Sequence, residues 1–116
     1  MPNTVPSKTD VLQGTLDLMV LRTLESLGPQ HGYGIAARIE QVSAGALQLN
    51  MGTLYPALMR LEQRGLIRGK WGATETKRKA RFYAITAAGQ RQLEKEKQVW
   101  ERMAGIIHTL LYSEEG

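Results

Sequence analysis

Cysteine is absent from this chain of 116 residues, and its absence excludes several kinds of protein. A disulfide framework, a thiolate nucleophile and a cysteine-based zinc site are all impossible, so stability must come from packing within one copy or shared with a second. No apolar run approaches the roughly 18 residues that cross a bilayer, and the first nine residues do not resemble a secretion signal. The sequence therefore predicts one cytoplasmic domain with a modest core.

Acidic side chains are scarce in the middle of the chain. Residues 50 to 91 hold nine Lys and Arg residues against two acids, although the net charge of the whole chain is only +4. A localised positive field attracts polyanions, of which nucleic acid is the commonest and an anionic membrane surface is another. Charge alone leaves that choice open.

Hydrophobic spacing predicts a mainly α protein with a small β-hairpin (α+β). The predicted elements, in order, are a mobile arm over 1–9, helices over 10–27, 32–42 and about 50–64, strands over 66–71 and 80–86, and a last helix from 87 to about 111. The polar and basic stretch between the two strands is expected to project as a flexible flap. The predicted domains are residues 10–86 and the helical segment 87–116.

A proline leaves the start of the third helix open. Asn50 is a plausible N-cap, but Pro56 would then lie six positions into the helix, where it removes a backbone hydrogen bond. Either the helix starts nearer Gly52 or Thr53, or it is locally distorted. Its end is clearer, because Gly65 suits the left-handed conformation that commonly terminates helices.

Three helices followed by a strand, a basic loop and a second strand form the order of a winged helix-turn-helix. In that fold the third helix enters the major groove and the hairpin wing lies on the phosphate backbone. Side chains on the third helix and the wing are then the candidates for DNA contact. They are Asn50, Thr53, Tyr55, Pro56, Arg60, Lys77, Arg78, Lys79 and Arg81.

Two other readings compete with DNA binding. The third helix could be an ordinary core helix with a solvated face, in a winged-helix protein-interaction module whose wing binds an acidic partner. An enzyme is disfavoured, because no nucleophile–base pair or metal cluster is present, and His31 and His108 are far apart in sequence. The glycines around His31 lack the preceding strand and following Lys-Ser/Thr of a phosphate loop, which indicates a tight turn between helices. No cofactor is therefore expected.

The last helix carries a seam of coiled-coil type, with apolar residues at seven-residue spacing. The members of the seam are Leu93, Trp100, Met103, Ile107 and Leu110. Glu96 interrupts the seam in its first half. At about 1.5 Å per residue the helix would be about 39 Å long, more than a small domain needs to cover its core, so a partner is expected.

The sequence resembles the PadR family of bacterial transcriptional regulators over most of its length, roughly from Leu12 to Leu111. The motifs that carry the resemblance are Leu12-Gln-Gly-Thr-Leu16, Gly28-Pro-Gln-His-Gly-Tyr-Gly-Ile35, Gly52-Thr-Leu-Tyr-Pro-Ala-Leu58, Arg60-Leu-Glu62, Gly65-Leu-Ile67 and Arg81-Phe-Tyr-Ala-Ile-Thr86 with Gly89. A tyrosine pair is usual near Phe82, and here it is Phe-Tyr.

The resemblance implies a homodimeric winged-helix repressor of nearby genes, bound to double-stranded DNA at an inverted-repeat operator. It implies dimerisation through the first and C-terminal helices, which places Leu16 in the interface with the seam. It also places Tyr33 near the DNA backbone, although a half-buried core tyrosine is an equal reading.

The two tryptophans are expected to have different roles. Trp100 on the seam is an interface anchor or, as in multidrug-sensing members of the family, a platform for a planar hydrophobic effector. Trp71 at the end of the first wing strand is expected to be structural.

Overall fold

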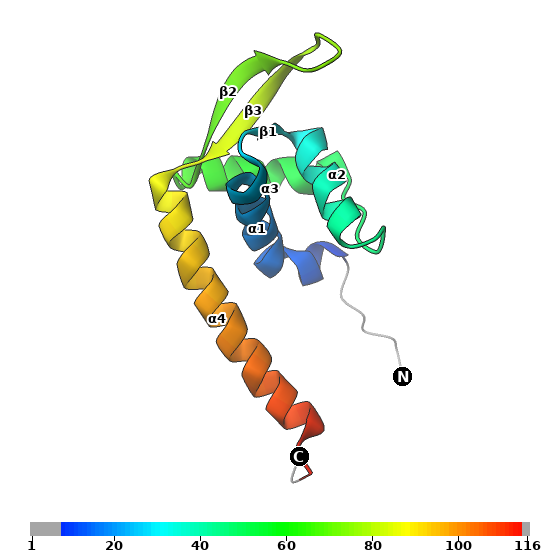
Figure 1. Ribbon diagram of the computed structural model, residues 1–116, viewed down its shortest axis with the longest axis vertical. Coiled ribbons are helices and arrows are strands. Elements are labelled where there is room, and N and C mark those ends of the chain that lie inside the picture. The colour runs from blue at the N-terminus through cyan, green and yellow to red at the C-terminus, as the bar shows by residue number, and fades with distance from the viewer. Residues whose placement is uncertain (1–7, 115–116) are drawn as a thin grey trace.

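The structure is a computed structural model that describes residues 8–114, with side chains from residue 15 onward. Its elements are α1 (Lys8–Leu27), β1 (Gln30–His31), α2 (Gly32–Val42), α3 (Met51–Gln63), β2 (Ile67–Ala73), β3 (Lys79–Ile85) and α4 (Ala87–Tyr112). Four helices and a small antiparallel sheet confirm the predicted fold class (Figure 1). The predicted arm over 1–9 lies mostly outside the described residues, and α1 already includes Lys8, two residues before the expected start.

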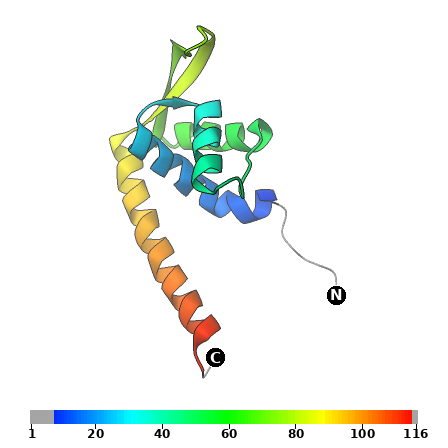
Figure 2. The same ribbon diagram turned by 45° about the vertical axis from the view of Figure 1, so that its right-hand side comes forward.

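The central helix is α1, which contacts α2, α3, α4 and β3. Figures 1 and 2 both show α1 between α4 on one side and α2 on the other. Apolar side chains lie on several faces of α1, so several neighbouring elements pack against it at once. Its side chains Val20, Leu21 and Leu24 are at most 1% exposed and meet the buried leucines of α3 in one core. Each such fully buried side chain stabilises the fold by about 1.5–3 kcal/mol.

The sheet has the strand order β1-β3-β2, and both pairings are antiparallel. The strand β1 lies where the sequence predicts a tight turn between helices. This strand has only two residues, and Gln30 and His31 pair with Tyr83 and Phe82 of β3. A two-residue strand carries no readable alternation and exists only because β3 offers a free edge.

The hairpin formed by β2 and β3 is longer than predicted. Its strands run to Ala73 and from Lys79, so the predicted eight-residue flap reduces to a turn over residues 74–78. Within that turn the Thr74 N–H donates to the Arg78 carbonyl at 2.8 Å, and the Lys77 N–H donates to the Thr74 carbonyl at 2.8 Å. The loop is therefore shorter than predicted, and these bonds close it on itself.

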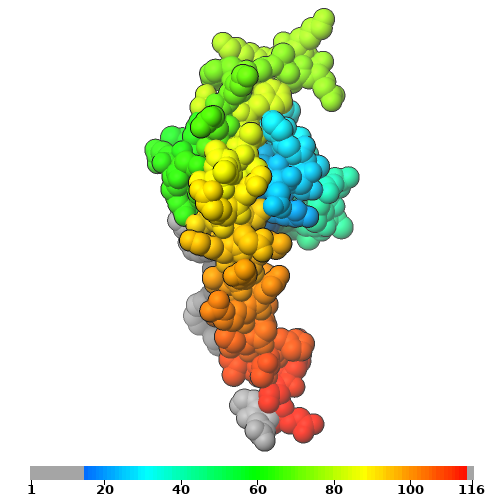
Figure 3. Space-filling model, turned by 60° about the vertical axis from the view of Figure 1, so that its left-hand side comes forward, coloured from blue at the N-terminus to red at the C-terminus, as the bar shows by residue number. Residues whose placement is uncertain are grey.

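The last helix, α4, begins after Thr86, whose hydroxyl accepts a hydrogen bond from the Gly89 N–H at 3.0 Å, as an N-cap does. Its first turns pack on the domain, where Gly89 and Leu93 are buried. The C-terminal half of α4 extends away from the other elements (Figure 3), and the molecule measures 58 × 33 × 24 Å. The C-terminal part of α4 is therefore available to another molecule.

Candidate nucleic-acid interface

Helix α3 starts immediately after Asn50, which settles the choice that Pro56 left open. The Asn50 side-chain oxygen accepts a hydrogen bond from the Thr53 N–H at 2.8 Å, as an N-cap does. Pro56 lies inside the helix and cannot donate to the carbonyl of Gly52. At the other end Gly65 has a φ of 73°, the left-handed conformation predicted for it. Asn50 thus organises the first turn of the candidate DNA-facing helix.

One face of α3 is exposed along its whole length. The core face holds Leu54, Ala57, Leu58 and Leu61, each 0% exposed. The residues of the exposed face recur at three- and four-residue spacing, and two of them, Tyr55 and Pro56, are predicted DNA contacts. Its members are Gly52, Tyr55, Pro56, Met59 and Gln63, here called the α3 stripe. Met59 was missed in the sequence analysis, although its spacing of three from Pro56 would have placed it on this face.

Arg60 does not lie on the α3 stripe. Its guanidinium donates to Asp17 of α1 at 3.0 Å, and the Asp17 side chain is only 16% exposed. The sequence suggests Arg60 as a candidate DNA contact, and in the structure its side chain is 39% exposed while one guanidinium nitrogen joins α3 to α1. The acceptor is 43 residues away in sequence, so no local pattern could have revealed the pair.

The wing presents cations at its turn. Lys77, Arg78 and Lys79 are exposed, and Lys77 has a φ of 62°, which turns the chain sharply at this point. The Arg78 N–H donates to the Thr74 hydroxyl at 3.1 Å, which ties the backbone beneath these side chains. Lys77 and Arg78 therefore lie on a hydrogen-bonded turn and Lys79 lies at the start of β3, and all three predicted wing cations are open to solvent.

Arg81, the fourth predicted wing cation, is engaged inside the domain. Its guanidinium donates to Glu62 of α3 at 2.6 Å, and the same Glu62 oxygen accepts the Gly69 N–H at 3.0 Å. Burial alone would raise the pKa of Glu62, but the two hydrogen bonds and the Arg81 charge lower it below its ordinary value. The hydrogen bond that Arg81 donates to Glu62 in turn raises the pKa of Arg81. Arg81 therefore acts within a network that joins the wing to α3.

Trp71, which was expected to be structural, is exposed at 58% of its surface. Lys79 places its ammonium 5.2 Å from the Trp71 ring centroid, and the Arg81 guanidinium lies 5.9 Å from that centroid. Cations at such distances are attracted to the ring face. An aromatic platform between two cations on the wing was not anticipated, because cross-strand register decides which residues meet.

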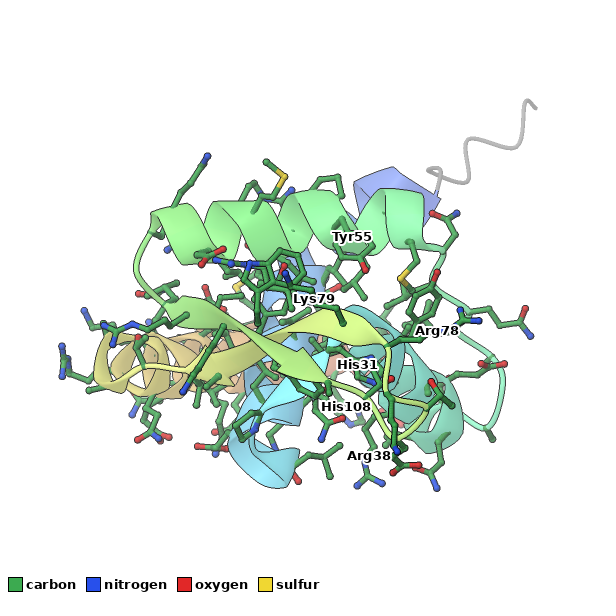
Figure 4. The ribbon with its side chains drawn as sticks, turned by 90° about the horizontal axis from the view of Figure 1, so that it is seen from above. His31, Arg38, Tyr55, Arg78, Lys79 and His108 are labelled. Carbon is green, nitrogen blue, oxygen red and sulfur yellow. The ribbon has the colours of Figure 1, made fainter. Side chains whose placement is uncertain are left out.

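An open hollow of about 910 Å³ lies between the wing and the start of α2, with Tyr55 at its edge. Its lining combines aromatic rings and cations, including His31, Tyr33, Trp71, Arg78 and Lys79. Figure 4 shows Tyr55 on α3 beside the wing, with Lys79 on the strand and Arg78 at the turn. Residues predicted from separate segments therefore surround one concave surface.

The start of α2 is built by His31 and Gly32. The His31 Nδ1 accepts the Gly34 N–H at 3.1 Å and caps the helix, and its ring meets Phe82 of β3 edge-on at 5.3 Å. A side chain at Gly32 would lie against the Tyr55 ring, so glycine allows α2 and α3 to approach. Tyr33 next to it is 67% exposed, which contradicts the half-buried reading and leaves it open to a ligand.

The seam of α4 divides into a buried and an exposed part. Leu93 and the α1 residue Leu16 are 1% and 2% exposed, so both were wrongly expected in a dimer interface. They fill the core of their own subunit. The exposed apolar residues of α4 are Val99, Trp100, Met103, Ile106, Ile107, Leu110, Leu111 and Tyr112, each at least 47% exposed. One carboxylate oxygen of Glu96 accepts from Gln92 at 3.1 Å, and the other is shielded without a partner among the described residues.

The described residues contain no group of three or more His, Cys, Asp or Glu side chains that could hold a metal ion. His31 belongs to the cap of α2, whereas His108 lies on α4 with its ring 4.9 Å from Tyr112. Within the same part of the chain, every helix is too short or too polar to cross a membrane.

Three packed helices, an exposed stripe on the third and a cationic hairpin beside it define a winged helix-turn-helix protein. A family model described as "Transcriptional regulator PadR-like family" matches residues 20–95, more than half of the chain. The chain belongs to the PadR-like family of transcriptional regulators, which are not enzymes.

Solved structures agree with this assignment. A transcriptional regulator from Clostridium thermocellum is similar at 31% identity with a TM-score of 0.78, covering 86% of this chain and 96% of that one. A PadR-like transcriptional regulator from Bacillus cereus is similar at 28% identity with a TM-score of 0.76, covering 90% and 99%. A PadR family transcriptional regulator from Eggerthella lenta is similar at 27% identity with a TM-score of 0.76, covering 90% and 88%.

A longer protein also contains a related segment. An uncharacterized 37.1 kDa protein in transposon TN4556 of Streptomyces fradiae is 44% identical over 80 residues, which cover 69% of this chain. The chain spans about a fifth of the length of that relative, 21%.

Proposed function

We propose that this protein is a sequence-specific DNA-binding transcriptional regulator that acts in the cytoplasm as a homodimeric repressor of nearby genes. The observation that carries the proposal is the position of the α3 stripe beside the wing cations. Tyr55 of the stripe and the cations Arg78 and Lys79 line the same hollow. The α3 stripe, which would contact base edges, and the wing cations, which would contact phosphates, thus lie on one side of the molecule.

In this proposal the α3 stripe lies in the major groove and the wing lies on the phosphate backbone. Tyr55 and Thr53 supply hydroxyl groups, and Met59 and Pro56 supply apolar contact to base edges such as the thymine methyl. Tyr33, at the exposed start of α2, reaches the backbone on the other side of the hollow. Lys77, Arg78 and Lys79 neutralise phosphates, and release of their counterions supplies most of the sequence-independent affinity.

The exposed apolar side of α4 supports the homodimer. Eight large apolar side chains without cover form a surface of the kind that marks a protein contact. A second copy of the same helix buries them best, because Trp100, Met103, Ile107 and Leu110 recur at coiled-coil spacing. Two α3 helices about 34 Å apart would then meet an inverted-repeat operator in successive major grooves.

Control by an effector follows from that geometry. A planar hydrophobic small molecule bound near Trp100 would rotate the two subunits, and the two α3 helices would no longer reach successive grooves together. Such an effector would release the repressor without contacting DNA. Trp100 serves in this proposal as the interface anchor, and its use as an effector platform is tested separately below.

A mobility-shift assay with the DNA upstream of the protein's own gene tests the proposal. We expect a shift at nanomolar to micromolar protein that random DNA does not compete away at equal concentration. No shift at low salt, together with binding to an acidic protein, would favour the interaction-module alternative instead.

Lys79→Gln tests the role of the wing within this function. Loss of one phosphate contact should weaken binding to operator and random duplexes equally and make the slope of log affinity against log salt shallower by about 0.9. Fluorescence anisotropy over a salt series measures both quantities. The control is Lys95→Gln, which removes the same charge from an exposed position on α4 and should leave the slope unchanged.

A further inference from the structure

A hydrogen-bonded bridge connects the wing to α3. The guanidinium of Arg81 on β3 lies 2.6 Å from the Glu62 carboxylate on α3. The same carboxylate oxygen accepts the backbone N–H of Gly69 on β2 at 3.0 Å. One side chain of α3 therefore holds both strands of the hairpin, and charge-assisted bonds of this kind are about twice as strong as neutral ones.

The Arg81 guanidinium lies on one face of the hairpin, where its side chain is 36% exposed. A Cβ at Gly69 would meet the end of this side chain, so glycine lets the guanidinium lie directly against β2. The Tyr83 and Trp71 ring centroids lie 5.9 Å from the Arg81 guanidinium carbon. Trp71 pairs with Arg81 across the strands, and Gly69 pairs with Tyr83, so all four residues share this face.

The residues on this face of the hairpin continue toward the turn of the wing. Lys79 follows on the same face two residues before Arg81, with its ammonium 5.2 Å from the Trp71 ring. The order from core to turn is thus Glu62 and Arg81, whose side chains are 32% and 36% exposed, and then the exposed Trp71 and Lys79. The Arg81 guanidinium is paired within the domain, whereas the Lys79 ammonium has no carboxylate partner among the described residues.

We propose that Glu62 and Arg81, extended by Trp71, are positioning residues that set the angle between the wing and α3 and thereby determine operator discrimination. This set is called the wing brace, and the proposal rests on the proposed DNA-binding function. Arg81 in this proposal contacts no phosphate. The wing brace gives a role in specificity to Arg81, which the sequence suggested as a DNA contact, and to Trp71, which was expected to be structural.

The physical reason is that a two-stranded hairpin twists easily when nothing supports it. Contact of α3 with base edges and contact of the wing with the neighbouring phosphates can be made together only at one wing angle. Binding to random DNA needs charge alone and tolerates a range of angles. Loss of the wing brace should therefore weaken the operator complex more than the random complex.

The double variant Glu62→Gln with Arg81→Gln tests the proposal, because it removes the bridge and keeps the net charge. Anisotropy titrations over a salt series use a duplex from the DNA upstream of the gene and a random duplex of the same length. We expect the ratio of operator to random affinity to fall about tenfold, and the salt slope to equal that of the wild type. Lys79→Gln is the reference variant, because loss of a phosphate contact should make its salt slope shallower by about 0.9.

Two single variants complete the design. Glu62→Gln alone should also lower the ratio of operator to random affinity. Glu75→Gln, which removes an exposed carboxylate from the wing turn, should change the affinities for the operator and the random duplex by the same factor. A slope shallower by about 0.9 in the double variant would show that Arg81 contacts a phosphate and would overturn the proposal. An unchanged ratio would overturn it as well.

Amide exchange of Gly69 separates this proposal from the proposed function. The Gly69 N–H should exchange about tenfold faster in the double variant than in the wild type without DNA, because its acceptor becomes a neutral amide oxygen that no ion pair with position 81 holds in place. If the wild type binds no DNA, the proposed function fails whatever Gly69 does. If Gly69 exchange is unchanged, the wing brace fails even where DNA binding is intact.

Discussion

At the scale of single residues, the partner of each cation decides what that cation can do. Arg60 and Arg81 face carboxylates at 3.0 and 2.6 Å, whereas Lys77, Arg78 and Lys79 remain exposed. A count of positive charges along the sequence treats these five residues alike. Their chemistry differs because a paired guanidinium serves the fold, and an unpaired cation remains free for a polyanion.

The Glu62 carboxylate predicts a pH dependence of stability at this scale. Its pKa in the folded protein lies below the usual 4.5. The unfolded chain therefore binds the proton more readily, so the contribution of Glu62 is complete above about pH 5 and is lost as pH falls through the folded pKa. Urea unfolding at pH 7 should show the wild type more stable than Glu62→Gln, and at pH 3 the difference should be smaller. A constant difference at both pH values would contradict this account, and Glu75→Gln is the matched control.

At the scale of elements, a close backbone approach joins α4 to the wing. Gly89 in the first turns of α4 lies against the carbonyl of Leu66, which precedes β2. The Thr86 N–H also donates to the Leu66 carbonyl at 3.0 Å, and its hydroxyl donates to the Gly65 carbonyl at 2.7 Å. The start of α4 and the base of the wing therefore form one unit.

Gly89→Ala should disrupt that unit. A methyl group at this position would overlap the Leu66 carbonyl oxygen, so a backbone segment must shift. We expect a loss of about 2–3 kcal/mol in the free energy of unfolding, measured by urea denaturation. Gly105→Ala is the control, because nothing lies within 4 Å of that position in the same helix and alanine favours helix. Equal stability of the two variants would refute the close approach.

At the scale of the whole molecule, α4 carries the apolar surface that its own domain leaves uncovered. The helix is 26 residues long, and only Gly89 and Leu93 are buried in the subunit. The domain that places α3 and the wing is complete without the rest of α4. The remaining length therefore supports a role between subunits, where it would set the distance between two α3 helices.

Trp100→Ala tests that role. Trp100 is 54% exposed in the single subunit, and an aromatic anchor at the centre of an interface is typically worth about 2 kcal/mol or more. We expect the dimer dissociation constant to rise about thirtyfold in sedimentation equilibrium, with the exposed polar neighbour Gln98→Ala as the control. An intact dimer that no longer binds planar aromatic dyes would instead assign Trp100 to an effector. A monomeric wild type would contradict the whole arrangement.

The winged-helix order could be predicted from the sequence because its signals are local. The caps at Asn50 and Thr86 and the left-handed Gly65 each depend on a few neighbouring residues. The buried leucines of α3 follow from helical spacing. The strand β1 could not be predicted, since Gln30 and His31 pair only because β3 lies beside them.

The sequence by itself determined the order of the elements, the resemblance to a regulator family and the location of the basic segment. Only the tertiary structure decided which charges are free. Arg60 meets Asp17 and Arg81 meets Glu62 across separations of 43 and 19 residues, and no periodicity encodes such pairs. The structure also moved Leu16 and Leu93 from an expected interface into the core, because burial depends on every element that surrounds a side chain.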